Sequence, residues 1–164
     1  MKTSLEWRKG LFSSTYRITK EGRPVGELIE HAFAQTADGE LNGKKYTFRT
    51  KGFLNQKTDI IDRRTGDVIG GIEYNAWMTK ATLSFGPRKV LWKYTNMWNT
   101  KWSIYDSDSI KIDYSGSTSG GQIESSVDDE LLLLSGLFVT NYYWQLTAII
   151  LAVVFIPIIA NLTN

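Results

Sequence analysis

The 164-residue sequence contains no cysteine and a single histidine. The absence of cysteine excludes a disulfide framework, cysteine-ligated zinc and a thiol nucleophile. His31 is therefore the only imidazole available to a Ser-His-Asp triad. It follows Glu30 in a segment that we expect to form a hairpin bend, and we interpret it as a surface residue or a hydrogen-bonded structural one.

Other motifs for enzymatic chemistry are also missing. The sequence has no glycine-rich phosphate loop and no paired-histidine zinc motif. Residues 106–117 carry acids at the first and third positions of a calcium loop, but Lys111 stands where glycine is required and Ser117 where glutamate is required. We interpret 106–108 as a hairpin turn. The sequence predicts a protein that is not an enzyme and needs no cofactor or metal, with a site built from carboxylates as the remaining enzymatic alternative.

Charge is distributed unevenly along the chain, although the net charge is only +2. Residues 44–101 hold twelve Lys and Arg against four Asp and Glu, whereas residues 102–130 hold one Lys against seven acids. Residues 131–164 carry no charged side chain. Such asymmetry informs about partners rather than about the fold.

Apolar and polar residues alternate in the first 126 residues, for example in 81–85 and 110–114. A period of two indicates strands with one buried face and one solvated face. Turn signals such as Asp38-Gly39 and Asn42-Gly43 separate these runs, so we expect an antiparallel meander of about twelve strands. The expected strands are 4–9, 11–20, 23–31, 31–37, 44–51, 53–62, 67–75, 77–86, 88–95, 99–106, 109–116 and 119–126.

A faint internal repeat relates residues 18–28 to residues 61–72. Each segment reads as a strand, a glycine turn and a second strand with an interior glycine, which is Gly26 in the first and Gly70 in the second. An interior glycine predicts a bend or a close approach of two backbones, as at a barrel corner. Two ordinary hairpins that are alike by chance are the alternative.

The composition changes abruptly at Leu131, where a long apolar run begins. The three preceding residues, 128–130, are acidic. Acids favour a helix N-terminus, and Ser125 or Ser126 could act as the capping residue. A helix that is apolar on all faces must be buried in a protein or in a membrane.

Two locations are open to this helix. As a membrane span, residues 137–160 are long enough to cross about 30 Å of hydrocarbon, and aromatic residues 142–144 would suit an interfacial belt. Asn141 and Gln145 interrupt that run, and the acidic flank gives no orientation. As a core element, the helix would fill the lumen of a twelve-strand barrel, which side chains alone cannot fill. We favour the second location because packed interiors tolerate few voids.

We therefore expect an all-β fold, a closed antiparallel barrel of about twelve strands around a C-terminal hydrophobic helix. One domain would cover residues 1–164, with strands in 1–127 and a helix over 128–160 filling the barrel. Alternation places Trp92 and Trp102 in the core and Trp98 outside it.

Twelve antiparallel strands that end in one apolar helix resemble the tubby-like superfamily, which includes tubby C-terminal domains, LURP-one-related proteins and phospholipid scramblases. The resemblance covers residues 12–160 and rests on the hairpins 16–28 and 61–72 and on residues 128–133. It implies a terminal helix inside the barrel although that helix reads as a membrane span. Because tubby domains bind phosphoinositides through a basic surface, the resemblance also implies such a surface in this protein.

The basic middle of the chain is the best functional candidate. Alternation puts Arg49 and Lys51 on the outer face, opposite Tyr46 and Phe48, so neighbouring strands could build a positive patch. Each Lys or Arg near a membrane attracts anionic headgroups by ~1 kcal/mol. The alternative is that these side chains only keep the barrel wall soluble. The candidate lipid-binding residues are Lys44, Lys45, Arg49, Lys51, Lys57, Arg63, Arg64, Arg88, Lys89 and Lys93.

The sequence thus predicts a non-enzymatic module that associates with anionic phospholipid or membrane surfaces. The alternative function is a C-terminally anchored single-pass membrane protein whose β domain scaffolds a partner. We expect a monomer without a nucleic acid partner, and the sequence identifies no protein partner. Because residues 1–8 lack an apolar run, we expect a cytoplasmic, membrane-associated protein that is not secreted.

Overall fold

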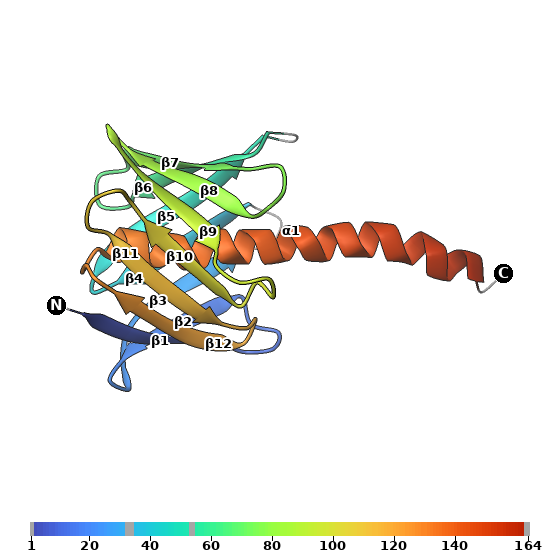
Figure 1. Cartoon of the computed structure of the whole chain (residues 1–164), viewed down its shortest axis with the longest axis horizontal. Helices are drawn as coiled ribbons and strands as arrows, with labels where there is room; N and C mark the ends of the chain where they lie inside the picture. Colours follow the sequence, from blue (N-terminus) through green and yellow to red (C-terminus); the bar gives the residue numbers. More distant parts are fainter. Residues whose placement is uncertain (1, 32–34, 53–54, 163–164) are drawn as a thin grey trace.

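The computed structural model describes residues 2–31, 35–52 and 55–162. In these ranges, twelve strands form one closed antiparallel barrel in which each strand pairs with its neighbours in sequence and β1 closes the ring against β12 (Figure 1). One helix follows the last strand. The elements are β1 (Thr3–Lys9), β2 (Thr15–Lys20), β3 (Arg23–His31), β4 (Thr36–Leu41), β5 (Lys44–Lys51), β6 (Lys57–Asp62), β7 (Val68–Tyr74), β8 (Lys80–Phe85), β9 (Arg88–Tyr94), β10 (Lys101–Tyr105), β11 (Lys111–Gly116), β12 (Gly120–Ser125) and α1 (Glu130–Leu162).

The predicted barrel of twelve strands is confirmed, and one strand is misplaced. Residues 32–34 of the expected strand 31–37 lie outside the described ranges. The rest of that prediction is wrong, because His31 ends β3, and β4 occupies Thr36–Leu41 and includes the dipeptide Asp38-Gly39 that we expected in a turn. Gly39 pairs with Leu28 and Tyr46 and faces the helix, where a Cβ atom would lie 3.1 Å from the side chain of Leu134. The glycine therefore serves close packing of the helix against the wall.

Inward-facing side chains build one continuous core between the barrel wall and α1. Trp92 and Trp102 are fully buried, as predicted, and Trp98 is exposed, as predicted. Aromatic rings join the wall to the helix, with Phe48 stacked on Phe138 at a centroid distance of 4.5 Å. The alternation in the sequence thus identified the inner face of the sheet.

The internal repeat corresponds to two hairpins with the same irregularity. The register of β2 and β3 shifts by one residue at Val25, and the register of β6 and β7 shifts at Ile69. The glycines that follow permit close approaches, since a Cβ on Gly26 would lie 2.2 Å from the carbonyl oxygen of Glu40 and one on Gly70 would lie 2.5 Å from the Phe85 ring. Such bulges bend a strand and increase its twist, which helps a sheet to close.

α1 enters the barrel at one end, follows its axis and leaves at the other (Figure 1). We call these the start end and the exit end. Because successive strands are antiparallel, the connections after even-numbered strands lie at the start end and those after odd-numbered strands at the exit end.

The helix is only partly enclosed. Its buried residues extend from Leu132 to Tyr143, whereas residues 147–162 are exposed. The expectation that residues 128–160 fill the barrel is therefore wrong for the second half. A helix of 33 residues is about 50 Å long, whereas a strand of six residues spans only about 20 Å. The first half is therefore the core element that we favoured, and the second half lies outside the barrel.

Candidate functional site

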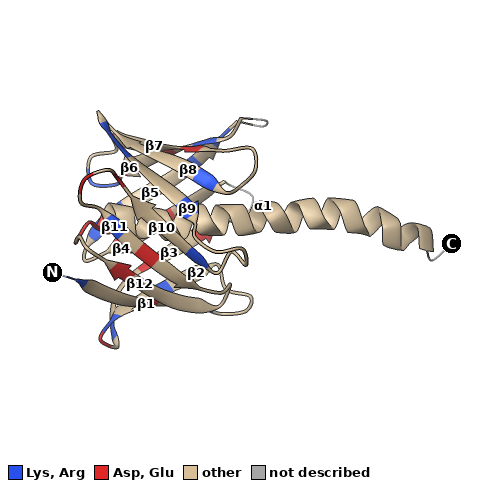
Figure 2. Cartoon of the chain, in the orientation of Figure 1, with Lys and Arg blue, Asp and Glu red and all other residues tan. Residues whose placement is uncertain are grey.

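The predicted basic residues lie outside the barrel but do not form one patch. Arg49 and Lys51 are exposed while Tyr46 and Phe48 are buried, as alternation predicted. The antiparallel strands, however, carry the cations to opposite ends of the barrel (Figure 2). Lys44, Lys45, Arg63, Arg64, Arg88 and Lys89 lie toward the start end, and Arg49, Lys51, Lys57 and Lys93 lie toward the exit end. Alternation predicts which face a side chain occupies but not which end of the sheet.

Acidic residues at the helix N-terminus neutralise part of the start end. Lys44 Nζ donates a 2.7 Å hydrogen bond to Glu130, and the side-chain amide of Asn42 donates a 3.3 Å hydrogen bond to the same carboxylate. Partial burial opposes ionisation of Glu130, but Lys44, a backbone N–H and Asn42 together outweigh it and hold its pKa below the ordinary value. Lys44 therefore fixes the first turn of α1 to the start end of the barrel.

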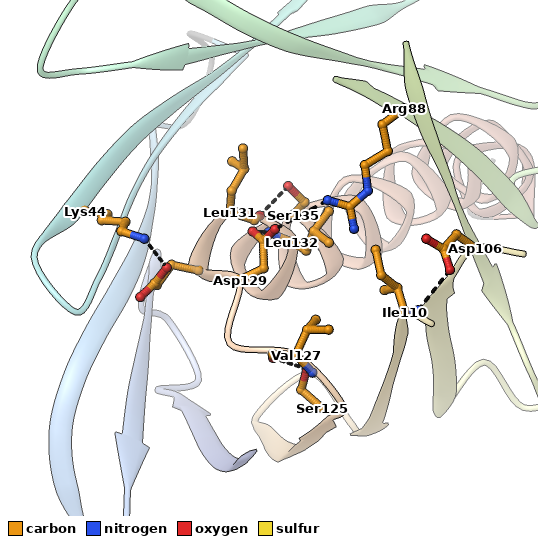
Figure 3. A network of polar contacts seen from close by, with 11 residues as sticks. Lys44, Arg88, Asp106, Ile110, Ser125, Val127, Asp129, Leu131, Leu132 and Ser135 are labelled. Carbon is orange, nitrogen blue, oxygen red and sulfur yellow. Dashed lines mark hydrogen bonds and ion pairs between the residues drawn. The ribbon is translucent and has the colours of Figure 1, made fainter. Parts of the chain in front are cut away.

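Asp129 caps α1, and the expected serine caps are wrong. Its carboxylate accepts the backbone N–H of Leu132 at 3.1 Å and lies 4.0 Å from Arg88 (Figure 3). Ser125 instead accepts the N–H of Val127, and Ser126 binds the 109–111 backbone, so both hold the connection between β12 and α1. A negative cap also complements the helix dipole. Arg88 thus has a structural partner.

The start end also has an open basic hollow of about 710 Å³. It lies between the turn before β5 and the turn after β6, and Arg63 on its wall is also 3.9 Å from Asp38. The hollow could attract a small anion, but partner carboxylates already contact some of its cations. Its lining residues are Gly43, Lys44, Lys45, Tyr46, Asp62, Arg63 and Arg64.

Asp106 and His31, which we considered for calcium binding and for acid–base chemistry, both make contacts within the fold. Asp106 accepts three backbone N–H groups at 2.9–3.0 Å, from residues 108, 109 and 110, and these bonds hold its pKa below the ordinary value. This is the hairpin turn that we inferred for 106–108. His31 lies 2.9 Å from Asp38 on the exposed side of the sheet. Within the described ranges, no group of three metal-ligating side chains occurs.

A collar of polar contacts surrounds α1 where it leaves the barrel. Gln145 donates to Glu30 at 2.6 Å, and Glu30 in turn lies 3.7 Å from Lys9. Tyr143 donates to the backbone carbonyl of Lys80, and Tyr142 donates to the side chain of Gln56. These contacts fix the helix at one level of the barrel, so the exposed half projects from a defined point.

Beyond the collar, α1 presents apolar side chains on every face. The segment 146–162 contains no charged residue, and its large side chains Val153, Phe155 and Ile156 are all more than half exposed. Of the described helices and strands, α1 is the one helix long and apolar enough to cross a membrane, with a mean hydropathy of 2.3, and the window that passes this test is not covered by the barrel. Each large apolar side chain left in water forfeits ~1.5–3 kcal/mol of burial.

The loops at the exit end add a second apolar feature, which the sequence reasoning missed. Leu11 and Phe12 lie at the tip of the β1–β2 connection, and both are exposed. Trp77 in the β7–β8 connection and Trp98 in the β9–β10 connection are each 84% exposed, and Met97 is exposed beside Trp98. We call these five residues the apolar rim.

The two tryptophan loops share one construction. Asn75 Oδ1 accepts the N–H groups of Thr79 and Lys80, both at 2.9 Å. Asn96 Oδ1 accepts those of Thr100 and Lys101, both at 3.0 Å. In each loop the amide of the same asparagine also donates to the threonine hydroxyl, and the residue after the tryptophan has a positive φ near 55°. The asparagine thus fixes the loop and leaves the tryptophan at its tip.

The signal for these loops is present in the sequence as the pattern Asn-x-Trp-x-Thr-Lys, at 75–80 and again at 96–101. The sequence analysis predicted Trp98 only as a single exposed residue, and the repeat is visible only when the two segments are aligned. No family model, curated protein or solved structure matches this chain. The resemblance to the tubby-like superfamily therefore stays a prediction.

Proposed function

We propose that this protein is a membrane-attached β-barrel module in which the exposed half of α1 inserts into a phospholipid bilayer and the barrel stands at its surface. The observation that carries the proposal is the uncovered apolar helix beyond the collar. Its 17 residues, 146–162, span about 26 Å, close to the thickness of ~30 Å that a membrane span crosses. Insertion would remove this apolar surface from water without disturbing the enclosed half.

The charged residues fit the same arrangement. Lys80 and Lys93 lie opposite each other on the outer face of β8 and β9 near the exit end, and Lys51 and Lys57 lie opposite each other on β5 and β6. Like charges directly opposite one another are unfavourable, and an anionic membrane surface would relieve this repulsion. Asp59 and Glu73 already pair with Lys51 and Lys57, so Lys80 and Lys93 are the stronger candidates for lipid contact. The proposal keeps the predicted lipid association and moves it to the exit end.

The proposed role of the enclosed half is mechanical. It connects the bilayer-inserted segment to the barrel through the core, so the barrel and the span would behave as one body. No catalytic group is required for such a module, and we continue to expect a protein that is not an enzyme.

The test uses the whole 164-residue chain with two charges placed in the exposed helix. Leu151→Lys/Val154→Lys should abolish flotation with liposomes, because each lysine at the centre of a span costs ~2.5–3.5 kcal/mol. The control is Val68→Lys/Leu91→Lys, which places the same charges on β7 and β9. Leu91 and Leu151 are matched, at 42% and 49% exposed. Both variants should keep the wild-type thermal melt in detergent. Flotation of the helix variant at the wild-type level would contradict the proposal.

A further inference from the structure

The large apolar residues exposed on the barrel are concentrated at one end. Of the described barrel residues, seven large hydrophobic side chains are exposed, and five of them form the apolar rim. The remaining two, Val68 and Leu91, lie elsewhere on the wall. The rim residues come from three separate connections, all of which lie at the exit end, where α1 leaves the barrel. Exposed apolar surface gathered in this way indicates a contact site.

We infer that the apolar rim is a second membrane-contacting site, which inserts its side chains into the interfacial layer of the same bilayer that receives α1. This inference rests on the proposed function and adds which barrel residues touch lipid and how deep the barrel sits. Trp is enriched at the level of the headgroups because its ring is apolar and its N–H is polar. Trp77 and Trp98 offer that chemistry at the tips of two fixed loops.

The length of the exposed helix supports a bilayer as the occupant. Residues 146–162 span about 26 Å, whereas the hydrocarbon core is ~30 Å thick. A helix of this length that begins at the exit end places that end at the membrane surface, where an apolar rim would contact the interfacial layer.

A lysine follows each of the two exposed tryptophans three residues later in the sequence. Lys80 and Lys101 are the last residues of the two repeated loop motifs and the first residues of β8 and β10. When the tips lie among the acyl chains and glycerol groups, these ammonium groups would lie at the level of the phosphates. Apolar tips backed by lysines are complementary to a bilayer interface, whereas an apolar protein partner would leave the lysines without matching charge.

The test places single labels in the full chain, which contains no cysteine of its own. Trp98→Cys reports the rim, Val154→Cys reports the helix, and Ser107→Cys at the start end is the control. Each variant carries a polarity-sensitive fluorophore and is reconstituted into phosphatidylcholine vesicles containing phosphatidylserine. Nitroxide-labelled lipids in these vesicles quench shallow or deep fluorophores. Thermal melts confirm that each variant is folded.

The expected result is a blue shift and shallow quenching at position 98, deep quenching at position 154, and neither at position 107. Deep quenching at 154 without quenching at 98 would overturn the inference and leave the proposed function intact. No quenching at 154 would overturn both. A blue shift at 98 without lipid quenching would show that protein, for example a second copy, covers the rim, and this would also overturn the inference.

Discussion

The side-chain amide of Gln145 donates a 2.6 Å hydrogen bond to Glu30 at the point where α1 leaves the barrel. On the barrel side of this contact, Asn141 and Tyr143 are buried, and on the far side the helix is exposed. Asn141 is itself held by a 2.7 Å hydrogen bond from Tyr16. The two polar residues that had counted against a membrane span, Asn141 and Gln145, thus mark the boundary between a core helix and an exposed one.

Glu30 should make stability depend on pH. Burial raises its pKa above the ordinary glutamate value, although Lys9 and Gln145 oppose the rise. Over a pH range that begins near pH 4.3, Glu30 is therefore still protonated in the folded state but already ionised in the unfolded state. Stability should fall as pH increases through this window, because the folded state binds more protons than the unfolded state.

Thermal melts of the detergent-solubilised full chain between acidic and neutral pH would measure this effect. Glu30→Gln should flatten the decline, because the amide does not ionise. Glu6→Gln, at an exposed position on β1, should leave it unchanged. An equally steep decline in Glu30→Gln would show that other groups cause it.

Gly136 should be intolerant of a side chain. A Cβ at this position would lie 2.2 Å from the ring of Tyr114. That ring cannot move away easily, because its hydroxyl donates to the carbonyls of Leu132 and Leu133 at 3.0 and 3.1 Å. Gly136→Ala should therefore destabilise the fold by ~1–3 kcal/mol, in the usual range for overpacking.

The control is Gly71→Ala, where the nearest atom to a new Cβ is 3.6 Å away. In denaturant unfolding, the free energy of unfolding should be clearly lower for Gly136→Ala and nearly unchanged for Gly71→Ala. If Gly136→Ala unfolded like the wild type, the helix would not be packed in the barrel at this depth.

The two groups of predicted cations should differ in lipid binding. Lys80→Gln/Lys93→Gln removes two charges at the exit end, and Arg64→Gln/Lys89→Gln removes two at the start end. At ~1 kcal/mol per charge, the first change should weaken binding to anionic vesicles roughly 30-fold at low salt. The second should have little effect, because the start end lies about 20 Å farther from the bilayer and the Debye length is ~10 Å in 0.1 M salt.

Vesicle sedimentation at two salt concentrations would measure both changes. The exit-end variant should also show a weaker salt dependence than the wild type. An equal loss of vesicle binding in the two variants would mean that the barrel lies on its side against the membrane. The lipid contact would then be on the barrel wall and not at the exit end.

Local sequence determined most of the wall and the chemistry of the helix. Alternation identified the buried tryptophans and the exposed lysines because neighbouring side chains on a strand point to opposite faces. The bulged hairpins were visible through Gly26 and Gly70, since only glycine permits those close approaches. The apolar tail was recognised as a helix that needs burial, because no face of it is polar.

Tertiary structure decided three features that local patterns do not encode. The barrel is shorter than α1, so enclosure stops at the Gln145 collar and the remaining residues project. Antiparallel pairing sent the basic residues to opposite ends, because the end that a residue occupies depends on strand direction across the whole sheet. The same pairing brought Phe12, Trp77 and Trp98, distant in the sequence, to one rim around the helix.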